Sequence, residues 1–313
     1  MMINRNLKIV FMGTPEFAVP ALEILADAGY PIVGVITSPD KPGGRGLRQL
    51  MISPVKSFAQ SRGIKVLQPL NLKSPKFLKE LEELNADLQV VVAFRMLPEA
   101  VWNMPRLGTM NLHGSLLPAY RGAAPIQWAI IRGEKTTGLT TFMLQHEIDE
   151  GRILKQLEIQ ILEHDDAGSL HDRMMYAGSG LVLGSVDLIQ SGKANFVSQD
   201  EQMASFAPKI HYEDGHIHWE KTYTEINNLV RGMAPYPGAW TLLDGLELKI
   251  YRTSVFSQKT DRPHGLLVFA SKKLIVQCKD GELEILEVQL AGKKKMSAKE
   301  FINGYKIRNL NLT

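Results

Sequence analysis

Two polar side chains at the end of a predicted strand could act on a carbonyl group. Asn111 and His113 are two residues apart in the stretch Asn-Leu-His-Gly-Ser. Because strand side chains repeat every two residues, both point to one face. An amide and an imidazole there could polarise a carbonyl and stabilise an oxyanion. The alternative is a pair of polar strand-end residues that cap the following loop.

A carboxylate, Asp149, stands in a predicted turn between strands over 137–144 and 153–161. It could orient His113 or relay a proton through water. The alternative to a functional role is that Asp149 is a solvated carboxylate in a turn before glycine. The small residues of the intervening stretch 120–125 let the backbone approach a ligand closely. No His, Cys and Asp spacing suggests a metal site, so no metal is expected.

The elements that must position these side chains alternate between strand and helix. Thr14 is the predicted N-cap of the first helix, with Pro15 at its first position. The pattern indicates a doubly wound, mostly parallel, Rossmann-like α/β sheet, which binds ligands at the carboxyl ends of its strands. A Gly-x-Gly-x-x-Gly sequence and a Walker A sequence are both absent, which disfavours NAD, FAD and P-loop nucleotides. The predicted strands are 7–12, 32–37, 88–94 and 108–112, and the later helices are 55–61 and 77–84.

The rest of the chain is expected to form a second, smaller domain. A long helix is predicted over 167–190, followed by a polar linker over 191–210. After it the pattern becomes all-β, interrupted by one helix at 223–232, as in a small OB-like β-barrel of five or six strands. The predicted domains are therefore 1–190 and 211–313.

Charge distribution separates the two halves. The 313 residues carry a net charge of +3, but residues 209–313 hold 16 basic and 12 acidic side chains, against 20 and 21 before them. A basic appended domain favours a phosphate-rich partner, with ordinary solubility as the alternative. The single Cys278 favours a reducing, cytoplasmic location, and no apolar stretch predicts a signal peptide or a membrane span. Without an extended apolar face, a monomer is expected.

Several motifs together resemble the 10-formyltetrahydrofolate-dependent formyltransferases. They are Asn-x-His-Gly-Ser-Leu-Leu-Pro followed by Tyr-Arg-Gly-Ala-Ala-Pro-Ile-Gln, Phe-Met-Gly-Thr-Pro-Glu-Phe-Ala near the start, Ser-Pro-Asp-Lys-Pro-Gly-Gly-Arg-Gly at 38–46 and Ala-Gly-Lys-Lys-Lys-Met at 291–296. The resemblance runs nearly end to end. It is greatest to the members that act on initiator tRNA.

This resemblance implies a catalytic domain at 1–190 and a tRNA-binding domain at 211–313. Asn111, His113 and Asp149 match the family's catalytic trio. The tetrahydrofolate-binding segment is matched by Ser115, Leu116, Leu117 and Pro118. The implied reaction moves the formyl group of 10-formyltetrahydrofolate, as cosubstrate, to the α-amine of initiator methionyl-tRNA, giving N-formylmethionyl-tRNA for translation initiation. Asn111 and a protonated His113 would hydrogen-bond the oxyanion, and Asp149 would favour the charged imidazole.

Two basic segments are the expected tRNA contacts. The loop 38–50 contains three glycines and two prolines and matches the family's insertion into the acceptor stem. Its candidates are Lys41, Arg45 and Arg48; the last stands where relatives often have lysine. In the C-terminal domain the candidates are Lys293, Lys294 and Lys295. A solvated loop and a solvated lysine face are the respective alternatives.

Two other classes of function remain open at this point. A related folate-dependent enzyme that acts on a small amine, such as a sugar nucleotide or glycinamide ribonucleotide, would have the same trio. A non-catalytic RNA-binding protein on this scaffold is disfavoured by the intact trio. The Gly-Arg-Gly loop and the basic domain favour tRNA over a small amine.

Overall fold

The computed structural model describes residues 5–43, 49–257, 262–270, 273–305 and 311–313. Their contacts divide the chain into two compact units. Unit 1 consists of residues 1–122, 138–159 and 171–206; unit 2 consists of residues 123–137, 160–170 and 207–313.

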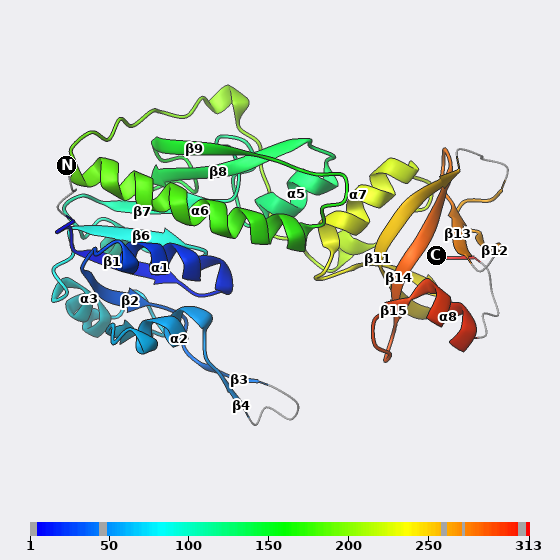
Figure 1. Cartoon of the computed structure of the whole chain (residues 1–313), viewed down its shortest axis with the longest axis horizontal. Coiled ribbons are helices and arrows are strands. Elements are labelled where there is room, and N and C mark those ends of the chain that lie inside the picture. The colour runs from blue at the N-terminus through cyan, green and yellow to red at the C-terminus, as the bar shows by residue number, and fades with distance from the viewer. Residues whose placement is uncertain (1–4, 44–48, 258–261, 271–272, 306–310) are drawn as a thin grey trace. The chain divides into compact units, whose positions relative to one another are not determined.

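Unit 1 is built on a seven-stranded sheet of order β5-β2-β1-β6-β7-β8-β9 (Figure 1). The first five strands in this order are parallel, and β8 runs antiparallel to β7. Every residue of β1 and β6 is buried, which explains their mostly apolar sequences; the exception, Gln89, accepts a hydrogen bond from the Thr109 hydroxyl at 3.0 Å. The predicted doubly wound sheet is therefore confirmed. The strands are β1 (Ile9–Gly13), β2 (Ile32–Ile36), β5 (Val66–Leu67), β6 (Leu88–Val92), β7 (Thr109–His113), β8 (Thr136–Met143) and β9 (Ile153–Gln160).

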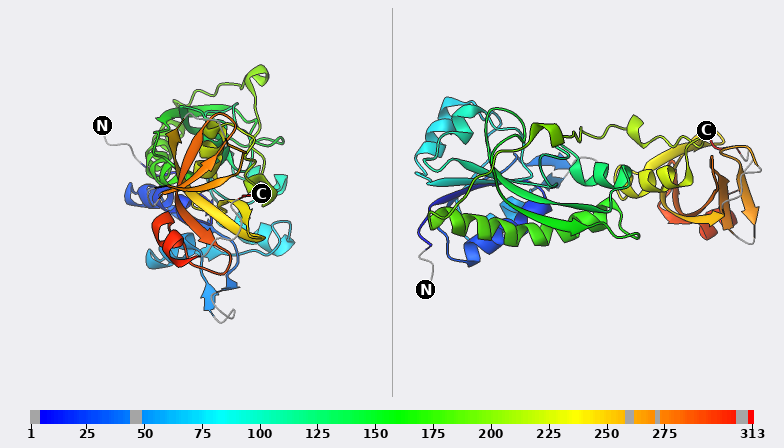
Figure 2. Two further views of the ribbon diagram at one scale, coloured as in Figure 1. Left: turned by 90° about the vertical axis from the view of Figure 1, so that its right-hand side faces the viewer. Right: turned by 90° about the horizontal axis from the view of Figure 1, so that it is seen from above.

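Helices cover both faces of this sheet, with α1 and α6 on one side and α3 on the other (Figure 2). The long helix α6 spans the residues predicted for it. Its Gly178 lies against β7, where a Cβ would come within 2.8 Å of the Leu112 side chain. Because glycine has no Cβ, the helix can approach the sheet closely at this position. The helix is continuous through Gly178 and the other glycines that it contains. The helices are α1 (Val19–Asp27), α2 (Pro54–Ser61), α3 (Pro75–Glu82), α4 (Glu99–Trp102) and α6 (Ala167–Gln190).

The start of the first helix differs from the prediction. A 3-10 turn over Glu16–Ala18 follows β1, and α1 begins only at Val19. Thr14 is therefore not its N-cap. Its hydroxyl lies 3.1 Å from the hydroxyl of Ser38, so it joins the ends of β1 and β2 instead. A local capping rule cannot anticipate this partner, because Ser38 arrives from the next strand.

Part of the predicted 38–50 loop forms a two-stranded hairpin (Figure 1). Its strands are β3 (Lys41–Gly43) and β4 (Gln49–Met51), and Lys41 pairs with Met51. The side chains of Leu50 and Met51 are 62% and 59% exposed, so these apolar groups of the hairpin are not buried.

Unit 2 contains a six-stranded antiparallel sheet, as expected for the small β domain. Five strands have the order β10-β11-β14-β13-β12, and β15 pairs with β14. Trp219, Ile226 and Phe301 are among the buried residues of its core. Its elements are α5 (Pro125–Ile131), α7 (Tyr223–Met233), α8 (Ala298–Gly304), β10 (Ala239–Leu243), β11 (Leu246–Ser257), β12 (Leu267–Ala270), β13 (Lys273–Gln277), β14 (Glu282–Leu290) and β15 (Met296–Ser297).

The contact-based division differs from the sequence-based domain limits. Residues 123–137 and 160–170 group with the C-terminal unit, although they precede residue 190. Helix packing accounts for the first segment: at Gly232 of α7 a Cβ would lie 2.4 Å from the side chain of Ile131 in α5. The second is tied by Arg231, whose Nε donates to the carbonyl oxygen of Asp165 at 2.6 Å. The functional limits of the domains remain a prediction.

Candidate active site

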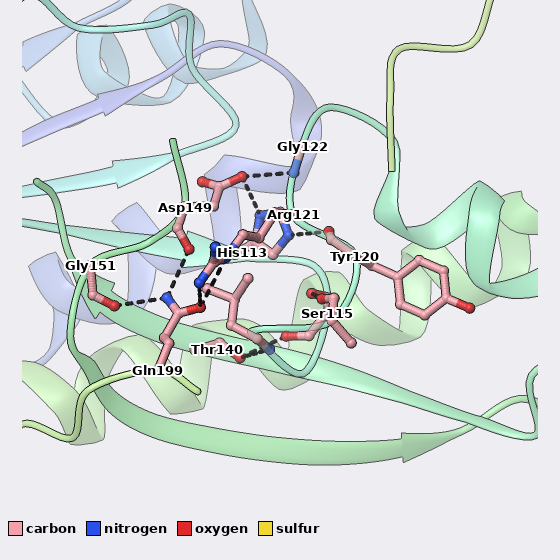
Figure 3. A network of polar contacts seen from close by, with 11 residues as sticks. His113, Ser115, Tyr120, Arg121, Gly122, Thr140, Asp149, Gly151 and Gln199 are labelled. Atoms are coloured by element: carbon pink, nitrogen blue, oxygen red, sulfur yellow. Dashed lines mark hydrogen bonds and ion pairs between the residues drawn. The ribbon is translucent and has the colours of Figure 1, made fainter. Parts of the chain in front are cut away.

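The end of β7 holds the imidazole of His113 in one orientation. The residue is 6% exposed and pairs with Thr140 of β8. Its Nε2 lies 2.9 Å from the carbonyl oxygen of Tyr120 (Figure 3). A carbonyl oxygen only accepts hydrogen bonds, so Nε2 carries a hydrogen. Nδ1 is then the atom that can gain or lose a proton during a reaction.

The Asp149 carboxylate faces that nitrogen. Its Oδ2 lies 3.6 Å from His113 Nδ1, and the two side chains are 13% and 7% exposed. The same oxygen accepts a hydrogen bond from the backbone N–H of Gly122 at 2.9 Å. The sequence-predicted carboxylate and imidazole therefore come together from two different turns.

The turn that carries Asp149 is tightly confined. Asp149 has a φ of 57°, in the left-handed region that few non-glycine residues occupy. Two residues later, a Cβ on Gly151 would lie 1.7 Å from the carbonyl oxygen of Met143. Glycine is required there, because the turn lies directly against the end of β8.

Asn111 precedes His113 by two residues on β7, with Phe142 of β8 as its partner. It is half-buried. Within the described ranges its side-chain amide has no hydrogen-bond partner in the protein. An amide donor near the strand end is thus available to a bound molecule.

The predicted folate segment, Ser115 to Pro118, is held in place by Thr140. The Thr140 hydroxyl donates to the Ser115 carbonyl oxygen at 2.7 Å and accepts from the Leu117 N–H at 3.1 Å. Ser115 and Leu117 are buried, whereas Leu116 and Pro118 are half-buried. The segment follows His113 directly, but only the half-buried pair retains surface for a ligand.

A cavity of about 590 Å³ lies beside the Asp149 turn. This volume is in the range of small-molecule sites. None of the four predicted folate residues lines it. The lining residues include Trp102, Gln145, Glu147, Glu150, Arg152 and Glu201.

Arg121, which the sequence prediction did not include, is the most buried charged group of the site. It is 2% exposed, and its guanidinium contacts Glu150 and Glu201 at 3.0 and 2.7 Å. The hydrogen bond to Glu201 raises the pKa of Arg121 and lowers the pKa of Glu201. The sequence offered one signal for this role. An arginine stands among the small residues that follow the Ser-Leu-Leu-Pro motif, and a charged side chain buried there needs a partner.

The predicted tRNA-binding residues fall into three groups. Lys41 is exposed on β3. Arg45 and Arg48 lie outside the described residues. Lys293, Lys294 and Lys295 are exposed in the turn between β14 and β15, and Lys295 pairs with Glu287 at 2.6 Å.

Neither a metal site nor a membrane-spanning helix is found among the described residues. Over those ranges, no cluster of three or more His, Cys, Asp or Glu side chains could hold a metal ion. Nor does any helix there have the length and apolarity needed to cross a bilayer.

Comparison with known proteins gives the same assignment at the level of family. The family model described as formyl transferase matches residues 7–184, and that of the formyl transferase C-terminal domain matches residues 209–306. The methionyl-tRNA formyltransferase of Parabacteroides distasonis is 50% identical, covering 97% of this chain and 98% of the relative. That of Bacteroides fragilis is 46% identical, covering 97% of each chain.

Solved structures show the same fold. The N-formyltransferase of Helicobacter canadensis, in complex with folinic acid and dTDP-3-aminofucose, has a TM-score of 0.69 and is 20% identical, covering 93% of this chain and all of the other. Such a distant likeness indicates the fold alone. The full-length identity of 46–50% is what decides the family. The chain therefore belongs to the formyl transferase family, among the methionyl-tRNA formyltransferases.

Proposed function

We propose that this chain transfers the formyl group of 10-formyltetrahydrofolate to the α-amine of initiator methionyl-tRNA. The main observation behind this proposal is that His113 Nδ1 lies 3.6 Å from the Asp149 carboxylate. On the same strand, the Asn111 side-chain amide has no hydrogen-bond partner within the described ranges. The near full-length likeness to methionyl-tRNA formyltransferases supports the choice of substrate. A cytoplasmic location and a monomeric state remain predictions.

The residues beside the Asp149 turn fit a folate. The cavity offers the Trp102 ring as an apolar surface and the Glu147 and Glu150 carboxylates as acceptors for ring N–H groups. Leu116 and Pro118 of the predicted folate segment are half-buried and do not line this cavity, so they can touch only a part of the folate that extends beyond it. The folate, when bound, supplies the formyl carbon that the substrate amine attacks.

The chain's own groups then move one proton and stabilise one developing charge. Because Nε2 of His113 is engaged by Tyr120, its Nδ1 accepts the proton that the attacking amine loses. Asp149 stabilises the imidazolium that forms, and Nδ1 returns the proton to the departing nitrogen. The Asn111 amide donates to the formyl oxygen as negative charge develops there.

The basic residues are proposed to bind the tRNA backbone. Lys293 and Lys294 are exposed and have no ion-pair partner within the described ranges, so they are free to neutralise phosphates. Lys295 is committed to Glu287, which reduces its contribution. Lys41, Arg45 and Arg48 are the corresponding proposal for the hairpin.

The test is a comparison of amine substrates under one assay. Transfer of labelled formyl from 10-formyltetrahydrofolate is measured with initiator methionyl-tRNA, elongator methionyl-tRNA and an amino sugar nucleotide. We expect transfer to initiator methionyl-tRNA at least 100-fold faster than to the other two. Transfer to the sugar nucleotide but not to methionyl-tRNA would assign the chain to the small-amine enzymes instead.

A further inference from the structure

The segment 197–206, which the sequence predicts as linker, runs along the active-site loops of unit 1. Val197 forms a two-way backbone bridge with Ile153, both hydrogen bonds being 2.8 Å long. At its other end, the carbonyl oxygen of Ser205 accepts from the Arg121 N–H at 2.8 Å. The segment is thus fixed to this unit at both ends, and Gln199 and Glu201, which lie between them, contact Arg121.

Between these ends, two side chains of the segment accept most of the hydrogen bonds that the Arg121 guanidinium donates. Nη1 and Nη2 donate to the two carboxylate oxygens of Glu201 at 2.8 and 2.7 Å. Nε and Nη2 donate to Oε1 of Gln199 at 3.2 and 2.8 Å. The remaining hydrogen on Nη1 goes to Glu150 at 3.0 Å. All five N–H groups are therefore used, and the guanidinium cannot rotate without losing several of them.

Gln199 connects this buried charge to the catalytic turn. While its Oε1 accepts from Arg121, its Nε2 donates to the carbonyl oxygens of Asp149 and Gly151 at 2.7 and 2.8 Å (Figure 3). These two carbonyls flank Glu150. One amide therefore holds the backbone from Asp149 to Gly151, directly beside the carboxylate that faces His113.

The turn needs such support. Asp149 is held in the left-handed conformation, which an unrestrained aspartate seldom keeps. Among the described residues, its carboxylate accepts a hydrogen bond from the Gly122 N–H, faces the imidazole and attracts the charge of Arg121. If the backbone of the turn relaxed, the carboxylate would move away from Nδ1 of His113.

We propose that Gln199 is a positioning residue for Asp149, with Arg121 and Glu201 fixing its orientation. The proposal rests on the proposed function, because it concerns the same His113 and Asp149 pair. It requires an amide at position 199: a group that accepts from a guanidinium at one atom and donates to two carbonyls at the other. A carboxylate of the same shape can accept but cannot donate.

The substitution Gln199→Glu isolates that requirement. It retains the size and the acceptors for Arg121 but removes both hydrogen bonds to the turn. Gln202→Glu makes the same chemical change three residues away on an exposed side chain, and it is the matched control. We measure kcat, the KM values for folate and methionyl-tRNA, and the melting temperature of each full-length variant.

The expected result is a fall in kcat of about 30- to 100-fold for Gln199→Glu, the cost of misplacing a reacting group by about 1 Å. Both KM values stay within about threefold, and the melting temperature stays within about 4 °C. Gln202→Glu matches the wild type in all four quantities. A kcat within threefold of wild type, or a loss confined to KM, would overturn the proposal.

A second variant keeps the test decisive should Gln199→Glu fold poorly. Glu201→Gln removes the carboxylate from Arg121 but changes a side chain that is 63% exposed. We expect kcat to fall about 3- to 10-fold with the KM for methionyl-tRNA unchanged, and an unaltered kcat would refute the inference. A wild-type chain that does not formylate methionyl-tRNA at all would instead refute the proposed function.

Discussion

The strongest single test of the reaction is Asp149→Asn. The substitution is isosteric, and its amide oxygen can still accept the Gly122 N–H that the carboxylate accepts at 2.9 Å. The turn should therefore persist. What is lost is the negative charge 3.6 Å from His113 Nδ1.

The size of the loss can be worked from that distance. Two unit charges 3.6 Å apart interact by about 4–5 kcal/mol at an effective dielectric constant of about 20. This is an upper bound on the stabilisation of the imidazolium, because a bound substrate supplies compensating groups. Since about 1.4 kcal/mol corresponds to a factor of ten, kcat should fall by up to about 1,000-fold.

The assay is single-turnover formyl transfer to initiator methionyl-tRNA, with substrate binding and the melting temperature measured in parallel. We expect the chemical step to slow by about 100- to 1,000-fold, with KM values and melting temperature close to wild type. A rate within tenfold of wild type would show that the charge of Asp149 does not serve the imidazolium, and the proton-transfer role of His113 would fail with it.

Three further predictions follow from the described contacts. The double variant Lys293→Ala, Lys294→Ala should weaken tRNA binding and reduce its logarithmic salt dependence by about 2, measured by a salt titration. Burial raises the pKa of the Cys278 thiol to about 12, so a thiol reagent at pH 8 should label it only on unfolding; rapid labelling of the folded chain would contradict this. Hydrogen bonds from Arg5 lower the pKa of Asp187. Its stabilisation is complete above the unfolded carboxyl pKa and is lost as the pH falls through the folded value, so Asp187→Asn should cost about 1–2 kcal/mol in urea unfolding at pH 7 and less at pH 3.

Local patterns were sufficient for much of the fold. The limits of α6 were predicted from apolar positions at helical spacing, and the strand predicted over 108–112 is one residue from the observed β7, Thr109–His113, at each end. The start of α1 was predicted wrongly at Thr14, because its hydroxyl has a partner, Ser38, on another strand.

The candidate site also combines features that local sequence patterns predict with features that depend on contacts between distant segments. Asn111 and His113 could be placed on one strand face from their spacing. Asp149 was a candidate from its place in a turn, and the family resemblance grouped it with the other two. No sequence spacing indicates that Gln199 would contact the Asp149 turn, or that Arg121 would be buried among Gln199, Glu150 and Glu201. Polarity in the segment 191–210 indicated a solvated linker. The same residues satisfy a buried charge, and composition does not distinguish the two cases.

The amino-acid sequence by itself determined the α/β class, the basic C-terminal third and the polar pair at the end of β7. These properties depend on composition and on residues a few positions apart. Only the tertiary structure decided which nitrogen of His113 faces Asp149 and which residues hold that turn in its left-handed conformation. The reason is that these hydrogen bonds join segments far apart in the sequence. Which segments meet depends on the path of the folded chain, and no periodic pattern in the sequence records it.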